Sequence, residues 1–118
     1  MVSIVDDDAS LRRSLGNLLM SAGLRVETFE SAETFLESGL LDNTGCLVLD
    51  LQMPGMGGLG LLKRLADSGT RLPVIILTAH GDDDMRRRTI QVGATAFLEK
   101  PVRGPVLLQA IQSALGAA

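Results

Sequence analysis

Aromatic side chains and cysteine are scarce in this chain of 118 residues, which has no Trp, no Tyr, three Phe and a single Cys. Without Trp and Tyr there is no row of aromatic rings on which nucleic-acid bases could stack. One cysteine excludes an internal disulfide, and because Cys46 lies in an apolar run we interpret it as a core residue, not a reactive thiol. The net charge of −3 gives no general reason to bind nucleic acid or a membrane surface.

The sequence also lacks an apolar run of membrane-spanning length and the pattern of a signal peptide. Hydrophobic residues nevertheless make up 46% of the chain, which is enough for a packed interior. The length suits one domain with one core. We therefore expect a single soluble, cytoplasmic domain with no direct binding to nucleic acid and no membrane segment.

Short apolar segments are predicted to be β-strands. Most are continuous apolar runs, as in parallel strands that are buried on both faces. Residues 24–29 alternate instead, which indicates an edge strand. The predicted strands are 2–5, 24–29, 46–49, 74–77 and 94–99.

The segments that follow the strands have the periodicity of amphipathic helices. Gly23 ends the first helix, Ser31 caps the second, acidic residues 82–84 start the fourth, and Pro105 lies in the first turn of the fifth. The residues predicted to face inward are Leu11, Leu15, Leu18, Leu19 and Ala22 in the first helix, Phe35 and Leu36 in the second, Leu59, Leu62, Leu65 and Ala66 in the third, and Leu107, Ala110, Ile111 and Ala114 in the fifth. Strict alternation of five strands and five helices predicts an α/β fold, a doubly wound parallel sheet with helices on both faces.

Polar residues stand where four of the predicted strands end: Asp6 and Asp7, then Asp50, then Thr78, and then Lys100. In an open parallel sheet the ligand site forms outside the carboxyl ends of the strands, so these side chains should converge. Crowded carboxylates repel one another unless a cation lies among them, and oxygen ligands favour a hard ion such as Mg²⁺. A lysine and a hydroxyl beside that ion would make a site for a tetrahedral oxyanion.

Four motifs in this order carry a resemblance to a known family: Val5-Asp6-Asp7, Leu49-Asp50-Leu51-Gln52-Met53-Pro54-Gly55-Met56, Thr78-Ala79 and Lys100-Pro101. From Val2 to about Leu115 the chain resembles the receiver domain of bacterial two-component response regulators. The segments 78–82 and 99–101 are most similar to the FixJ-like group. The resemblance implies a flavodoxin-like (βα)5 sheet with strand order 2-1-3-4-5. We expect residues 1–118 to be the receiver (phosphoacceptor) domain, with no output domain in this chain.

The resemblance also implies roles for the strand-end residues. Asp50 would be the phosphoacceptor, and Lys100, which precedes a cis peptide bond to Pro101, would pair with a phosphoryl oxygen. Mg²⁺ would be held by Asp6, Asp7, Asp50 and the backbone carbonyl of Gln52, with Asp6 acting partly through water. Each residue also has an interpretation without a functional role: Asp50 could cap a turn, Asp6 and Asp7 could form a solvated turn, and Lys100 could be an ordinary surface lysine. We interpret the neighbouring Asp8 as a helix cap.

A signalling switch is implied in the same way. The Thr78 hydroxyl and the Ala79 backbone N–H would bind the phosphoryl group, and Phe97 would turn inward when Thr78 moves. This change would reach the face formed by the fourth helix, fifth strand and fifth helix. The alternatives are a plain strand-end threonine and a core phenylalanine. Arg86, Arg87 and Arg88 are either a solvated helix face or a contact on this signalling face, and we expect His80 to be an exposed loop residue.

The expected function is a phosphorylation-dependent switch that takes a phosphoryl group from a sensor histidine kinase and loses it to water. Its output would be a transcriptional domain or partner, with a homodimer through the signalling face also allowed. The alternative is a stand-alone phosphorelay intermediate or phosphate sink. A true phosphatase would need a second carboxylate where Gln52 stands, and a flavin or nucleotide binder would need a glycine-rich loop after the first strand. A phosphorylation-independent interaction domain would usually have lost one of the site residues.

The sequence departs from the family at Gly57 and Gly60, where relatives often carry polar or acidic residues, and at Val102, where a Phe is common. None of these positions is expected to touch the chemistry. The two glycines should make the start of the third helix more flexible, by about 1 kcal/mol each relative to alanine.

Overall fold

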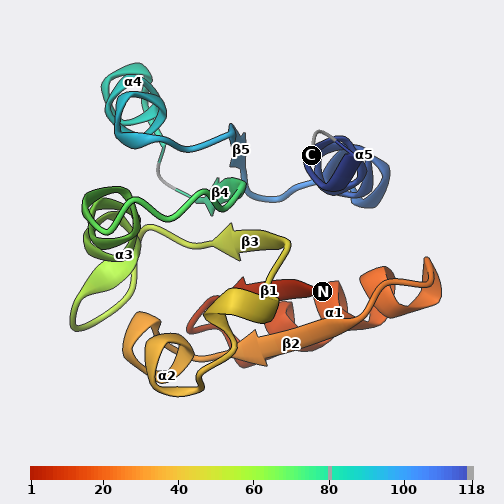
Figure 1. Ribbon diagram of the computed structural model, residues 1–118. Coiled ribbons are helices and arrows are strands. Elements are labelled where there is room, and N and C mark those ends of the chain that lie inside the picture. The colour runs from red at the N-terminus through yellow and green to blue at the C-terminus, as the bar shows by residue number, and fades with distance from the viewer. Residues whose placement is uncertain (80, 117–118) are drawn as a thin grey trace.

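The computed structural model describes residues 1–79 and 81–116, and its centre is a five-stranded parallel sheet (Figure 1). The strands lie in the order β2-β1-β3-β4-β5. Their bounds are β1 Val2–Val5, β2 Val26–Phe29, β3 Cys46–Leu49, β4 Val74–Thr78 and β5 Ala96–Glu99. The predicted doubly wound α/β fold and its strand order are therefore confirmed.

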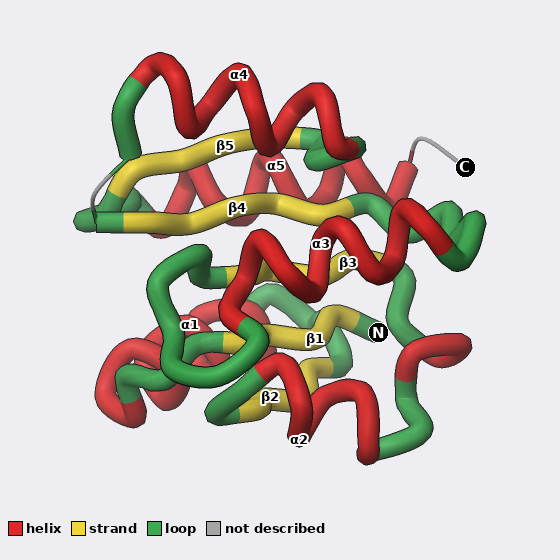
Figure 2. Tube along the Cα trace, turned by 90° about the vertical axis from the view of Figure 1, so that its left-hand side faces the viewer, coloured by secondary structure: helices red, strands yellow, loops and turns green. Residues whose placement is uncertain are grey.

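Helices cover both faces of this sheet. Figure 1 shows α1 and α5 on one side and α2, α3 and α4 on the other, and in Figure 2 the second group lies in front of the strands. The bounds are α1 Ala9–Ser21, α2 Ala32–Glu37, α3 Gly57–Asp67, α4 Asp83–Val92 and α5 Gly104–Gly116. A short 3₁₀ helix, Leu41–Asn43, was not predicted.

Alternate residues of each central strand enter different cores. In β3, Cys46 and Val48 pack with the buried residues of α1 and α5, whereas Leu47 and Leu49 pack with those of α2 and α3. All of β1, β3 and β4 is buried, which is why these strands read as continuous apolar runs. Cys46 is fully buried, and burial raises the pKa of its thiol to about 12. Its interpretation as a core residue is confirmed.

Three predicted helix starts are confirmed by their caps. The side chains of Asp8, Ser31 and Asp82 accept hydrogen bonds from the backbone N–H three residues ahead, at 3.2, 3.0 and 2.7 Å. Each bond satisfies an N–H that the first helical turn leaves free. The first cap places α1 directly after the acidic turn that follows β1, and Gly23, with a φ of +84°, follows the end of that helix.

The predicted inward face of α3 is confirmed at Leu62 and Leu65, while Leu59 is half-buried and packs against the same core. The prediction was wrong at Ala66, which is exposed, and it missed the buried Leu61 and Gly58. Gly58 has no side chain to contribute to a hydrophobic pattern. Ala22, predicted to face inward after the first helix, is also exposed. Two strand bounds were also too long at their starts, because β2 begins at residue 26 and β5 at residue 96.

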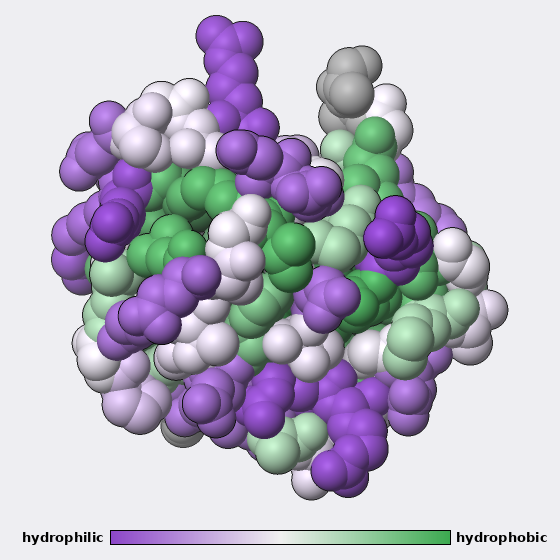
Figure 3. All heavy atoms as spheres, turned by 60° about the horizontal axis from the view of Figure 1, so that its bottom comes forward, coloured by the Kyte–Doolittle hydropathy of each residue, from purple (hydrophilic) through white to green (hydrophobic). Residues whose placement is uncertain are grey.

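On the face drawn in Figure 3, apolar residues gather in the middle and polar side chains lie around them. Among the described residues the exposed large hydrophobic side chains are Met20, Ile90 and Val106. Ile90 lies in α4 and Val106 in α5. No helix within residues 1–79 and 81–116 is both long and apolar enough to cross a membrane.

Candidate functional site

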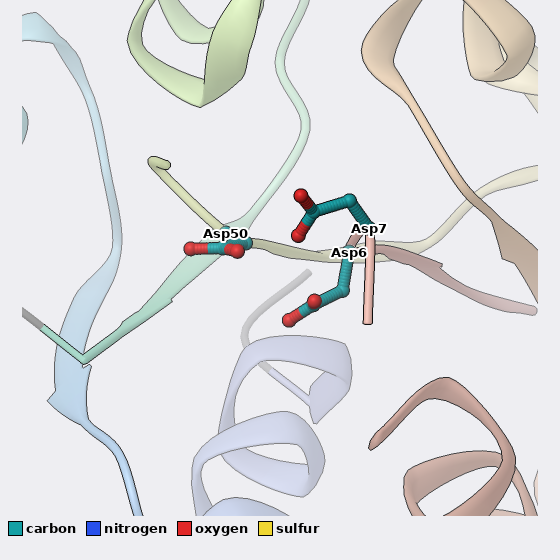
Figure 4. A group of neighbouring side chains, drawn as sticks. All are labelled: Asp6, Asp7 and Asp50. Carbon is teal, nitrogen blue, oxygen red and sulfur yellow. The ribbon is translucent and has the colours of Figure 1, made fainter. Parts of the chain in front are cut away.

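The structure brings the predicted strand-end residues to one edge of the sheet. Asp6 and Asp7 follow β1, Asp50 follows β3, Thr78 ends β4 and Lys100 follows β5. One carboxylate oxygen from each of the three aspartates lies within 4.8 Å of the others, and Figure 4 shows their side chains gathered around a common space.

Backbone hydrogen bonds continue the sheet ladder past the strand ends and hold these residues in place. The N–H of Asp6 donates to the carbonyl of Phe29 at 3.1 Å, and the N–H of Asp50 donates to the carbonyl of Val5 at 3.0 Å. On the other side of the site, the N–H of Lys100 donates to the carbonyl of Thr78 at 2.8 Å. The parallel pairing of the strands therefore sets the distances between the backbones of the site residues, independently of any side-chain contact.

Lys100 binds two of the carboxylates. Its Nζ lies 2.8 Å from Asp6 Oδ2 and 3.4 Å from Asp50 Oδ2. The exposed side-chain fractions are 19% for Lys100, 3% for Asp6 and 6% for Asp50, so little water screens these pairs. The peptide bond between Lys100 and Pro101 is cis.

The turn after β1 is held by further hydrogen bonds. Asp6 Oδ1 accepts the backbone N–H of Asp8 at 2.9 Å. Arg12, one turn into α1, donates from Nη1 to the backbone carbonyl of Asp6 at 2.7 Å. Asp7 is exposed, so its carboxylate stays open to solvent beside the buried Asp6. Arg12 was not predicted, because a side chain that binds a backbone carbonyl leaves no motif in the sequence.

Burial shifts the proton affinity of the site. Loss of water around Asp50 raises the pKa of its carboxyl group. The backbone N–H of Gln52, which donates to Asp50 Oδ1 at 3.1 Å, lowers this pKa, as does Lys100, whereas the negative charge of Asp6 raises it further. Burial alone would lower the pKa of the Lys100 ammonium, but Asp6 and then Asp50 outweigh burial, and the pKa is raised. Lys100 therefore stays charged at neutral pH, and Asp50 holds its proton more tightly than a free aspartate does.

The donor set fits a hard divalent cation. It offers carboxylate oxygens from three residues, which are the ligands that such an ion prefers. Asp7 is exposed to solvent, so its carboxylate could replace a water molecule bound to an incoming ion. One ammonium lies between two buried carboxylates, which leaves a net negative charge there, so a further cation would be favoured. The backbone carbonyl of Gln52 remains a predicted ligand.

The residues of the predicted switch lie on two neighbouring strands: Thr78 ends β4, Ala79 follows it, and Phe97 lies in β5. Thr78 and Phe97 are 1% and 5% exposed, and Ala79 is exposed. The guanidinium of Arg86 lies over the Phe97 ring, 5.2 Å from its centroid. A Cβ atom on Gly81 would lie 2.6 Å from Phe97 Cε1, so only glycine leaves room for this ring position. His80 lies outside the described residues.

Two further glycines matter here, and the sequence pattern did not single out the first. A Cβ atom on Gly58 would overlap the carbonyl oxygen of Asp50, so the first turn of α3 packs directly on the backbone of that aspartate. Gly57 adopts a φ of +71°, in the left-handed region that favours glycine. The departure from the family at position 57 therefore suits the local backbone.

The sequence model of the family described as "Response regulator receiver domain" matches residues 2–112. The chain belongs to this family. Its relatives include Nodulation protein W of Bradyrhizobium diazoefficiens, 46% identical over 114 residues, and Transcriptional regulatory protein FixJ of Azorhizobium caulinodans, 42% identical over 115 residues. The alignments cover 97% and 98% of this chain but 50% and 54% of those proteins, so the chain spans about half the length of the curated relatives it matches.

Solved receiver domains share the same architecture. The response regulator StyR superposes with a TM-score of 0.90 at 47% identity over 98% of this chain and 59% of that one. FixJ-N superposes with a TM-score of 0.87 at 39% identity, over 99% of this chain and 94% of that one. The predicted membership in the receiver family and the similarity to its FixJ-like group are confirmed.

Proposed function

We propose that this receiver domain accepts a phosphoryl group on Asp50 from the phosphohistidine of a sensor histidine kinase and acts as a cytoplasmic signalling switch. The observation that carries the proposal is the placement of Lys100 Nζ between Asp6 and Asp50, beside a third carboxylate that is open to solvent. This arrangement combines a nucleophile, a fixed cation and oxygen ligands for Mg²⁺ at one edge of the sheet.

In the proposed reaction a carboxylate oxygen of Asp50 attacks the phosphorus atom. An O–P bond forms while the P–N bond to the kinase histidine breaks, and the imidazole leaves with the electron pair. The charge on the phosphoryl oxygens spreads in the transition state, and Lys100 lies where it can neutralise part of it. When bound by Asp6, Asp7, Asp50 and the Gln52 carbonyl, Mg²⁺ supplies further positive charge there. Water later attacks the phosphorus and releases inorganic phosphate, so the domain resets itself without acting on another substrate.

The signal is proposed to leave through Thr78 and Phe97. The Thr78 hydroxyl and the Ala79 N–H would bind the phosphoryl group and shift the conformational equilibrium of α4. The Phe97 ring, which lies under Arg86, would respond to the movement of Thr78. Ile90 and Val106 provide exposed apolar side chains on α4 and α5 for a partner or a second copy. Because similar proteins are named transcriptional regulators, the proposed output is control of transcription by a domain or partner outside residues 1–118.

Intact-mass spectrometry tests the phosphoacceptor directly. With Mg²⁺ and the small phosphodonor acetyl phosphate, the protein should gain one phosphoryl group, and chelation of the metal should prevent the gain. Asp50→Asn should abolish labelling, while the exposed control Asp42→Asn should label like the parent. Labelling of Asp50→Asn at the parent's rate would contradict the proposal.

A further inference from the structure

Glu33, in α2, reaches the loop that links β3 to α3. Its Oε2 accepts the backbone N–H of Met56 at 3.3 Å. Its Oε1 is buried and has no hydrogen-bond partner among the described residues. A buried carboxylate oxygen without a partner is costly, so the contact is not explained by the stability of Glu33 itself.

Gly55 makes room for this carboxylate. The residue adopts a φ of +77°, and a Cβ atom there would overlap Glu33 Oε2. A side chain at position 55 would therefore meet two obstacles, one in the backbone conformation and one in the carboxylate. The Glu33 carboxylate can approach the loop this closely because Gly55 has no side chain.

A surface hollow of about 410 Å³ lies beside this contact between the loop and α2. It is lined by Asp7, Glu30, Ser31, Glu33, Pro54 and Gly55. The bond from Met56 to Glu33 crosses between the two elements on one side of this hollow. At the other end of the loop, the N–H of Gln52 donates to Asp50 Oδ1. The segment 52–56 is thus held at one end by the central carboxylate of the site and at the other by Glu33.

We propose that Glu33 is a positioning residue for the metal site: by holding the β3–α3 loop, it keeps the Gln52 carbonyl in place for Mg²⁺. The inference rests on the proposed function, because it needs Mg²⁺ to bind at Asp6, Asp7 and Asp50. Glu33 acts through the loop and does not touch the ion.

Calorimetric titration with Mg²⁺ alone, on folded protein after chelator treatment, tests the inference. Glu33→Ala should weaken Mg²⁺ binding by about 3- to 10-fold, less than the 10- to 100-fold that loss of a direct outer-shell partner causes. Glu33→Gln removes the same charge but keeps an oxygen that can accept the Met56 N–H, so it should restore most of the affinity. Glu37→Ala removes an equal charge from an exposed position of the same helix and should bind Mg²⁺ like the parent.

The outcomes separate the two proposals. If the parent itself binds no Mg²⁺, the proposed metal site fails. If the parent binds Mg²⁺ and Glu33→Ala binds it as tightly, the positioning role is wrong. If Glu33→Gln loses as much affinity as Glu33→Ala, the effect comes from charge alone and the positioning role is again wrong.

A double-substitution experiment tests the contact without metal. Gly55→Ala should lower the urea midpoint of the parent, because it meets both the positive φ and the carboxylate. In the Glu33→Ala background the drop should be smaller, because only the backbone obstacle remains. Equal drops in both backgrounds would show that Glu33 and Gly55 do not interact, which would overturn the inference.

Discussion

Replacing Lys100 with alanine should destabilise the metal-free protein strongly. At an effective dielectric constant near 20, unit charges at 2.8 and 3.4 Å attract by about 6 and about 5 kcal/mol. Desolvation of the buried ammonium offsets several kcal/mol of this attraction. Removing one partner of a buried ion pair costs about 3–5 kcal/mol because the other charge stays buried and uncompensated. The side chains of Asp6 and Asp50, which are 3% and 6% exposed, are both left in that state.

The loss should depend on pH and on metal. Without Lys100 one of the two carboxylates can take up a proton, so the cost should be smaller at pH 5 than at pH 8. Mg²⁺ binds only the folded state and stabilises it by mass action. Because the variant has one more uncompensated negative charge, the same Mg²⁺ concentration should stabilise it more than it stabilises the parent.

Urea unfolding measures both effects. The chain has no Trp or Tyr, so unfolding is followed by circular dichroism of the helices, with chelator or with Mg²⁺, at both pH values. Lys63→Ala is the matched control, since Lys63 is the only other lysine and is exposed on α3. A loss below about 1 kcal/mol for Lys100→Ala, as at an exposed pair, with no dependence on pH or Mg²⁺, would refute the reasoning.

Three further predictions concern the centre of the site and its switch. Burial raises the pKa of Asp50, so the folded protein binds this proton more tightly than the unfolded chain does. The free energy of unfolding should therefore fall as the pH rises from the ordinary aspartate pKa through the raised one. In urea titrations with chelator, Asp50→Asn should remove that fall. Thr78→Ala, which lacks the hydroxyl, and Gly81→Ala, which displaces the Phe97 ring, should both still accept a phosphoryl group. Amide chemical shifts on α4, β5 and α5 should respond less to phosphorylation in these variants than in the parent. Shifts like those of the parent would exclude a signalling route through Thr78 and Phe97. Gly58→Ala should cost at least about 3 kcal/mol in unfolding experiments, because overpacking costs about 1–3 kcal/mol where neighbours can yield, and here the neighbour is the backbone of Asp50.

The sequence by itself determined the fold class and the edge of the sheet at which the site lies. Buried parallel strands need apolar residues at every position, so the chain marks β1, β3 and β4 as continuous runs. The end of each run marks where a side chain can leave the core. Asp6, Asp50 and Lys100 were therefore predictable as neighbours although up to 94 positions separate them.

The tertiary structure alone decided how the site is supported. Arg12 binds a backbone carbonyl, and Glu33 lies against Gly55, a residue with no side chain. Gly58 and Gly81 matter through the atoms that a Cβ would displace. Hydrophobic periodicity and polar motifs record which side chains are buried or charged. Close approach between a backbone and a distant group depends on how two elements pack, and this becomes visible only when the helices lie on the sheet.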